Sequence, residues 1–201
     1  GLRWRASGKF TIGMNIGKEN AFNNVGNLAY STGIQSGSTG YHELTETQLN
    51  EGVFMGRRDL SGWNNDIELS YSFNNKMNLW LYVRHYWNQV KYQSFAELQS
   101  DGSLQPISYS GMSEQGLPLN DESISFFNID LVYTWRFAPG SDILLIYKNG
   151  TSNYFSGAQA RHTYEYDARN LTNYPGQNTF SVKILYFIDF ERVKGKKVLR
   201  F

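Results

Sequence analysis

The stretch FNIDLVYTWRFAPGSDILLIYKN, residues 127–149, alternates between large apolar and polar side chains over its first half. One set of alternate positions is apolar throughout: Phe127, Ile129, Leu131, Tyr133, Trp135 and Phe137. The other set consists of Asn128, Asp130, Val132, Thr134 and Arg136, of which only Val132 is apolar. Successive side chains of a β-strand point to opposite faces of a sheet, so this period of two predicts a strand with one apolar and one polar face.

A tight turn interrupts the alternation at residues 138–141, where the sequence reads Ala-Pro-Gly-Ser. Proline fixes φ and glycine tolerates positive φ, so these residues are typical of turns. A second strand follows from Asp142 to about Asn149, and the whole stretch therefore predicts a β-hairpin. In a soluble β-sandwich its apolar face packs on a second sheet, whereas in an outer-membrane barrel that face contacts lipid. Alternation alone does not separate these two environments.

The composition favours an all-β protein. The 201 residues include 14 Tyr, 13 Phe, 5 Trp and 19 Gly, which are residue types of strands and turns. The absence of cysteine excludes a disulfide scaffold and thiol-based metal or redox chemistry. A net charge of +1 gives no indication of a nucleic-acid partner, and no pattern predicts a cofactor.

The same alternation predicts about six strands, at residues 2–17, up to 73, 77–98, 127–137, 142–149 and 177–190. Short turns at residues 74–76 and 138–141 separate long loops at about 18–51, 99–122 and 151–176. Along an up-and-down meander, all short turns then lie at one end and all long loops at the other. Outer-membrane barrels have this asymmetry, with short periplasmic turns and long extracellular loops. The pattern therefore favours an antiparallel transmembrane β-barrel.

The length of the strands and their two faces agree with this interpretation. Residues 128–137 span ten positions, and a tilted strand needs about 9–11 to cross the hydrocarbon. The polar positions predict lumen-facing side chains, which form either an ion-paired filling or a pore lining: Glu68, Arg84, Asn128, Asp130, Arg136 and Lys183. The apolar positions predict lipid-facing side chains: Ile67, Leu69, Tyr71, Phe73, Leu79, Leu81, Ile129, Leu131, Tyr133, Trp135, Ile184, Tyr186 and Ile188.

Six strands are too few for an ordinary closed barrel, because eight already leave an interior just filled by side chains. Open strand edges are not tolerated in lipid. We therefore expect residues 1–190 to be the C-terminal portion of a larger barrel, with further strands upstream. Several chains that share one barrel would be the other arrangement. Residues 191–201 are expected to form a basic periplasmic tail.

Several segments together resemble a known family: residues 56–59, 71–77, 83–87, 127–130 with 135–141, and 185–189. They are similar to the C-terminal barrel region of Bacteroidota outer-membrane proteins of the DUF5916 family. The resemblance covers residues 52–190 well and residues 1–51 loosely. It implies location in the bacterial outer membrane, and a family-9-type carbohydrate-binding-like domain that precedes the barrel. It does not define an activity, and the sugar binding of that domain does not carry over to these residues.

Residues capable of catalysis or metal binding are few. His42, His85 and His162 form no pair at metal-ligand spacing. His162 is the best candidate for a general base, beside Glu165 or Asp167. No nucleophile motif such as G-x-S-x-G is present, so we expect no catalytic residues and no enzyme activity.

The last predicted loop is rich in aromatic side chains. Tyr154, Phe155, Tyr164 and Tyr166, with Tyr174 nearby, either contact a sugar or a partner protein or pack within the loop. We expect a non-enzymatic outer-membrane barrel that anchors or accompanies a surface carbohydrate-related or membrane-assembly complex. Its partners are then outer-membrane lipid and proteins of that complex. A transport pore for oligosaccharides and a soluble β-sandwich binding module are the alternatives.

Overall fold

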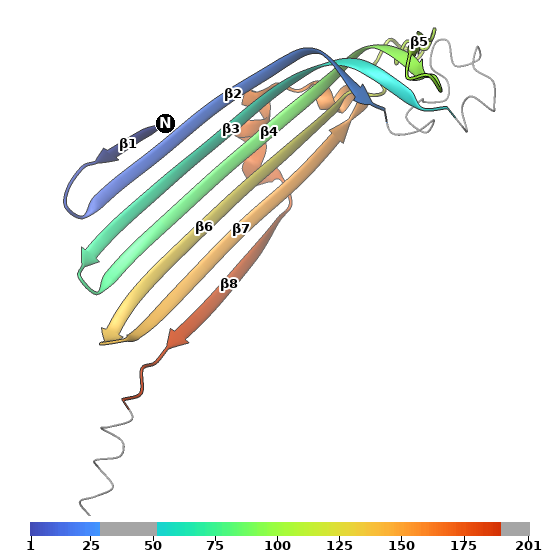
Figure 1. Cartoon of the computed structure of the whole chain (residues 1–201). Helices are drawn as coiled ribbons and strands as arrows, with labels where there is room; N and C mark the ends of the chain where they lie inside the picture. The colour runs from blue at the N-terminus through green and yellow to red at the C-terminus, as the bar shows by residue number, and fades with distance from the viewer. Residues whose placement is uncertain (29–51, 190–201) are drawn as a thin grey trace, which may run out of the picture.

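A computed structural model of the chain describes residues 1–28 and 52–189, and these form one antiparallel sheet of eight strands (Figure 1). Its strands pair in the order β1-β2-β3-β4-β6-β7-β8, and the short β5 pairs with β4. The sheet is not closed into a barrel, and β1 and β8 are its two edges. The strands are β1 Leu2–Arg5, β2 Phe10–Asn27, β3 Phe54–Asn74, β4 Met77–Leu98, β5 Leu104–Pro106, β6 Glu122–Ala138, β7 Ser141–Ser156 and β8 Gly176–Leu185.

The expected antiparallel β-sheet is confirmed in a fold that is mostly β, but the count of about six strands was wrong. The predicted strand at residues 2–17 is a hairpin, β1 and β2, which pair antiparallel. Ser7 makes the turn, because its hydroxyl accepts the backbone N–H groups of Lys9 and Phe10, each at 3.1 Å. A local side-chain hydrogen bond of this kind favours a turn over a continuous strand.

The strands also run further than the sequence predicted. β2 continues to Asn27 and β7 to Ser156, where loops were expected. In β2 the apolar alternation ends after Ile16, yet pairing with β3 continues to Asn27, with a shift of register between Ala21 and Asn24. At the shift Asn23 has a φ of 56° and donates its backbone N–H to Asp59 at 2.9 Å. The rest of the predicted loop at 18–51, with His42, and the predicted tail at 191–201 lie outside the described residues.

The register places the apolar positions of neighbouring strands on one face. Leu81 of β4 pairs with Leu69 of β3 and with Leu131 of β6. We call this the apolar face; within the strands it carries Ile67, Leu69, Tyr71, Leu79, Leu81, Ile129, Leu131, Tyr133, Trp135 and Ile184. The opposite, polar face carries Glu68, Arg84, Asn128, Asp130, Arg136 and Lys183. Phe73 packs edge-on against Tyr71 on the apolar face, whereas Tyr186 and Ile188 follow the end of β8.

The apolar face has no second sheet over it within residues 1–28 and 52–189, because all described strands belong to one sheet. Its side chains near the short turns are therefore accessible: Trp135 is 39% exposed, Leu145 37% and Phe180 68%. A soluble β-sandwich requires two packed sheets, and this part of the chain supplies only one. None of the described helices is long and apolar enough to span a membrane.

The buried hydrophobic core lies at the end with the long connections. Phe54, Tyr92, Phe95, Tyr109 and Leu28 form one cluster there. The Phe95 ring stacks on Tyr92 at 5.6 Å and meets Tyr109 edge-on at 4.8 Å. Tyr109 belongs to the β4–β6 connection, so the cluster fixes that connection to the ends of β3 and β4.

Replacement of Phe54 by alanine is expected to lower the free energy of unfolding by about 3 kcal/mol, because a fully buried aromatic side chain leaves a cavity. Urea unfolding measures this change. Phe22→Ala is the matched control, since Phe22 lies on the same sheet and is 71% exposed. Equal effects of the two substitutions would contradict the position of the core.

Candidate functional site

The connection between β7 and β8 lies against the sheet, behind it in the view of Figure 1. It contains the 3-10 helix η3 Gly157–Arg161, the α-helix α2 Tyr164–Asn170 and the 3-10 helix η4 Leu171–Asn173. Thr163 caps α2, because its hydroxyl accepts the backbone N–H of Tyr166 at 3.2 Å. Acidic Glu165 and Asp167 in the first turn complement the positive end of the helix dipole.

The apolar face changes its chemistry where this connection covers it. Along β4 it continues from Val83 to His85 and Gln89, and along β6 it continues to Ser125 and Ser123. The polar side chains among them are buried: His85 is 7% exposed, and Gln89, Ser123 and Ser125 are at most 5% exposed. The strands themselves therefore present polar groups to the connection.

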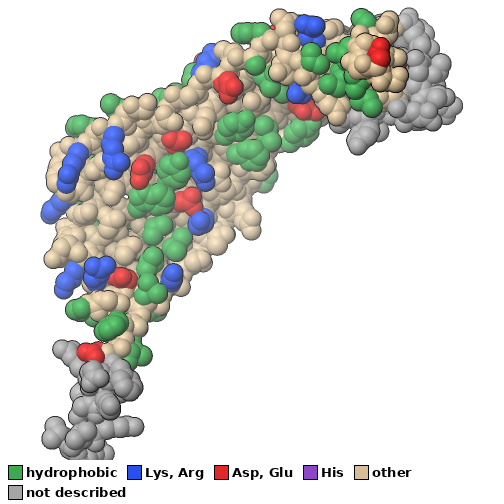
Figure 2. Space-filling view, viewed as in Figure 1, with side chains coloured by type: hydrophobic (Ala, Val, Ile, Leu, Met, Phe, Trp, Pro, Cys, Tyr) green, Lys and Arg blue, Asp and Glu red, His purple; other side chains and the backbone are tan. Residues whose placement is uncertain are grey.

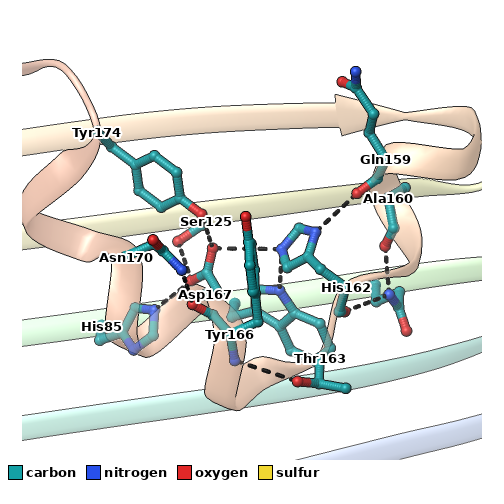
Figure 3. Close-up of polar contacts among 12 residues, drawn as sticks. His85, Ser125, Gln159, Ala160, His162, Thr163, Tyr166, Asp167, Asn170 and Tyr174 are labelled. Atoms are coloured by element: carbon teal, nitrogen blue, oxygen red, sulfur yellow. Dashed lines mark hydrogen bonds and ion pairs between the residues drawn. The ribbon is translucent and has the colours of Figure 1, made fainter.

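Asp167 of α2 joins the connection to the sheet (Figure 3). Its carboxylate is fully buried and accepts three hydrogen bonds: from Ser125 of β6 at 2.7 Å, His85 of β4 at 2.9 Å and Tyr174 at 3.3 Å. A buried charge is tolerated only when it is paired and hydrogen-bonded. The donors come from two strands and from the segment after η4, so this carboxylate fixes α2 and the segment after η4 on the sheet.

The hydrogen bonds also determine the ionisation of this site. Burial by itself raises the pKa of Asp167, but the hydrogen bonds from His85 and Ser125 outweigh it, and the pKa is lowered from its ordinary value. Burial, and then the Asp167 charge and hydrogen bond, raise the pKa of Tyr174 to about 12. At neutral pH the carboxylate is therefore ionised and the phenol keeps its proton.

His162 contacts the other side of the same carboxylate, with Nε2 3.5 Å from an Asp167 oxygen. The indole N–H of Trp87 donates to this nitrogen at 3.3 Å, while Nδ1 lies 2.9 Å from the carbonyl oxygen of Gln159. An indole can only donate, so these contacts assign the proton of neutral His162 to Nδ1. Gln89 donates to the carbonyl oxygens of Ala160 and His162 and holds the backbone of η3 on β4 (Figure 3).

The four predicted contact aromatics divide into two pairs. Tyr164 stacks on Trp63 at 4.9 Å, and Phe155 packs edge-on against His162 at 4.8 Å, so both pack within the site. Tyr154 and Tyr166 are 61% and 57% exposed and remain accessible to a ligand or partner.

A second buried carboxylate fixes the start of the connection. Asp121, at the beginning of β6, is 2% exposed and accepts the backbone N–H of Tyr92 at 2.9 Å. Its other oxygen pairs with Arg161 of η3, and its carbonyl oxygen accepts the N–H of Gly157 at 2.7 Å. Carboxylates therefore hold the β4–β6 and β7–β8 connections to β4.

The combination of serine, histidine and aspartate does not have the geometry of a nucleophilic triad. In a triad the histidine lies between the other two, whereas here Ser125 and His85 both bond to one oxygen of Asp167. Ser125 is also only 1% exposed. Within the described ranges, no group of three or more acidic, histidine or cysteine residues could hold a metal ion. The arrangement is that of an anchor for the connection.

The polar face brings some of its predicted residues together. Asp130 pairs with Lys148 at 3.2 Å, and Arg136 pairs with Asp142 at 3.0 Å. Glu68 accepts the indole N–H of Trp80 at 2.9 Å, and Lys183 lies exposed on β8. Figure 2 shows acidic and basic side chains interspersed over this side of the sheet. Arg84, Asn128 and Asp130 line one shared hollow.

Sequence reasoning placed His162 beside Glu165 or Asp167, and the structure has it beside Asp167, but it did not bring His85 to the same carboxylate. Ser125 was missed altogether. Two features of the sequence could have indicated this site. On β6 the apolar set of alternate positions ends at Phe127 and continues with Ser125 and Ser123, and Thr163 is a helix-capping residue inside a predicted loop.

The fold and the site define an antiparallel single-sheet protein with a helical connection anchored over one end of the sheet. The chain belongs to the family described as "Domain of unknown function (DUF5916)", which matches residues 2–197. No curated protein and no solved structure matches the chain. Membership of the family that the sequence resembled is therefore confirmed.

Asp167→Asn is expected to destabilise the packing of the β7–β8 connection on the sheet by about 3 kcal/mol, because the buried pair of Asp167 and His85 loses its carboxylate. Limited proteolysis within residues 157–175 measures the change as much faster cleavage. Asp142→Asn is the matched control, since its partner Arg136 has a side chain that is 58% exposed and such pairs contribute about 0–1 kcal/mol. Equal cleavage of both variants would argue against the anchor.

The packing of the β7–β8 connection on the sheet is also expected to weaken at low pH. The folded-state pKa of Asp167 is lowered, so its stabilisation is complete above the unfolded-state value of 3.8 and disappears as the pH falls through the folded-state pKa. Hydrogen exchange of α2, followed from about pH 5 to pH 2, measures this loss. The Asp167→Asn variant should lack this component, and an unchanged profile in that variant would contradict the assignment.

Proposed function

We propose that this chain is a segment of the wall of an antiparallel outer-membrane β-barrel. The observation that carries the proposal is an apolar sheet face that, among the described residues, has no second sheet over it. Lipid is the environment that covers such a face while the opposite, charged face lines the lumen.

The dimensions of the apolar face support this proposal. On β6 it runs from Phe127 to Trp135, a span of nine residues, close to the ~9–11 that a tilted strand needs. β4 is longer, with 22 residues, and its excess lies on the side of the long connections. That excess carries His85, Trp87 and Gln89, which the β7–β8 connection covers.

Aromatic side chains gather at the short-turn border of the apolar face. Tyr71 meets Phe73 at 4.8 Å, Trp135 meets Phe137 at 6.1 Å, and Phe137 stacks on Tyr186 at 6.2 Å. Aromatic girdles at the lipid–water interface have this position. The short turns then face the periplasm, and the anchored connections face the outside.

The open edges support a larger assembly. Among the described residues, β1 and β8 each have one unpaired side, which lipid does not tolerate. The proposed barrel therefore closes through further strands, which we place upstream in the same polypeptide.

The outer end supports a role in anchoring or accompanying a surface complex, either carbohydrate-related or involved in membrane assembly. Asp121 and Asp167 hold the connections to the sheet there, and two exposed tyrosines lie at that end, Tyr154 on the polar face of β7 and Tyr166 on α2. Rigid presentation of exposed aromatic side chains is typical of binding surfaces. Transport is the second candidate, favoured by the hollow on the polar face.

The membrane assignment is tested by one arginine placed on either side of β6. Leu131→Arg, at the middle of the apolar face, is expected to cost about 2–4 kcal/mol, since charge at the bilayer midplane is destabilising. Val132→Arg points to the polar face and should change stability little. Detergent-extracted protein is refolded into lipid vesicles, and the folded fraction is measured against urea. Equal tolerance of both variants, or folding that needs no lipid or detergent, would refute the proposal.

A further inference from the structure

A hollow lies on the polar face where β4, β6, β7 and β8 meet. Its lining includes Arg84, Phe126, Asn128, Asp130, Lys148 and Gln177. Gly150 of β7 also lines it, directly across from Asn128 in the register. A Cβ at Gly150 would lie 3.2 Å from the Asn128 side-chain oxygen, so the missing side chain contributes to the space.

The polar lining offers several planar groups in a small space. Asn128 and Gln177 contribute amides, Arg84 contributes a guanidinium, and Asp130 contributes a carboxylate held by Lys148 at 3.2 Å. Amides donate and accept hydrogen bonds, a carboxylate accepts and a guanidinium donates. Such a set suits a ligand whose hydroxyl groups do both.

Aromatic rings lie beside these polar groups on the same face. Phe126 lines the hollow and stacks on Tyr86 of β4 at 6.2 Å, with the ring planes 30° apart. Further along β4, Tyr82 stacks on Trp80 at 5.7 Å, and the Arg84 guanidinium lies 5.2 Å from the centre of the Tyr82 ring. The rings of β4 therefore form a row that leads from the short-turn half of the sheet to the hollow.

We propose that this hollow binds a hexopyranose unit of an oligosaccharide. The C–H face of a sugar ring matches the aromatic side of the hollow, and its hydroxyls match the planar polar groups. A purely apolar ligand would leave the amides unpaired, and a strongly charged ligand would meet both signs of charge. The inference rests on the proposed function in one respect, because it takes the polar face to be the lumen surface along which a solute passes.

The test measures saturation-transfer NMR between detergent-solubilised native protein and one of three neutral hexopyranose oligomers: maltohexaose, cellohexaose or mannohexaose. Transfer to the ring protons of at least one of these sugars is expected. Gly150→Val fills the hollow and should weaken binding by about tenfold or more. Gly13→Val is the matched control, because Gly13 also lies on the polar face, outside the hollow, where a Cβ makes only ordinary contact, at 3.7 Å from Glu68.

Loss of transfer in Gly150→Val with retention in Gly13→Val would support the site. Phe126→Leu keeps a large apolar side chain but removes the ring, and it should weaken binding while the protein stays folded. Equal binding by Gly150→Val and the parent protein, or no transfer to any of the three sugars, would overturn the proposal. Either negative result leaves the folding of the Leu131→Arg and Val132→Arg variants in lipid unaffected, so failure of the sugar site is distinguishable from failure of the barrel assignment.

Discussion

An apolar sheet face cannot remain against water at the size observed here, and most other features of this protein follow from that constraint. Burial of apolar surface contributes roughly 25 cal/mol for each Å² removed from water. The described strands form one sheet, so they cannot cover each other as the two sheets of a sandwich do. The short-turn half of the face is uniformly apolar, whereas its other half is polar and covered by the chain itself. The chain itself therefore covers one half of this continuous face, and the proposed lipid contact concerns the other half.

The change between these halves occurs within single strands. On β4 it falls between Val83 and His85, and on β6 between Phe127 and Ser125. In the covered half of the face, Asp167 makes three hydrogen bonds where apolar contacts would otherwise lie. Its buried charge makes the position of the connection on the sheet specific. An apolar contact would allow the connection to slide, whereas a carboxylate shared by two strands and the segment after η4 has one satisfactory position. This explains how a segment joined to an edge strand keeps a fixed place over the middle of the sheet.

The polar face differs from the apolar face because it carries paired charges and contains a hollow. Charges of both signs are paired across strands, as between Asp130 and Lys148, which reduces the preference for any one ion. Glycine at Gly150 and aromatic rings at Phe126 and Tyr86 add space and stacking surfaces to a polar lining. This combination supports passage or retention of a neutral, hydroxyl-rich solute more than conduction of ions. The membrane assignment, the sugar site and the surface role are thus three separable proposals on one sheet.

The alternation of residues 127–137 by itself determined one strand and its two faces, because the period of side chains along a strand depends only on local geometry. The short turns at residues 74–76 and 138–141 determined that the strands they join pair antiparallel. The same local rule failed at Ser7, where a hydroxyl makes a turn, and at residues 18–27, where pairing with β3 maintains a strand without an apolar pattern. Only the tertiary structure decided that Asp167, Ser125 and His85 meet. Ser125 is 42 residues and His85 is 82 residues away from Asp167 along the chain. Long-range pairing of strands, rather than any local preference, brings them within hydrogen-bond distance of its carboxylate.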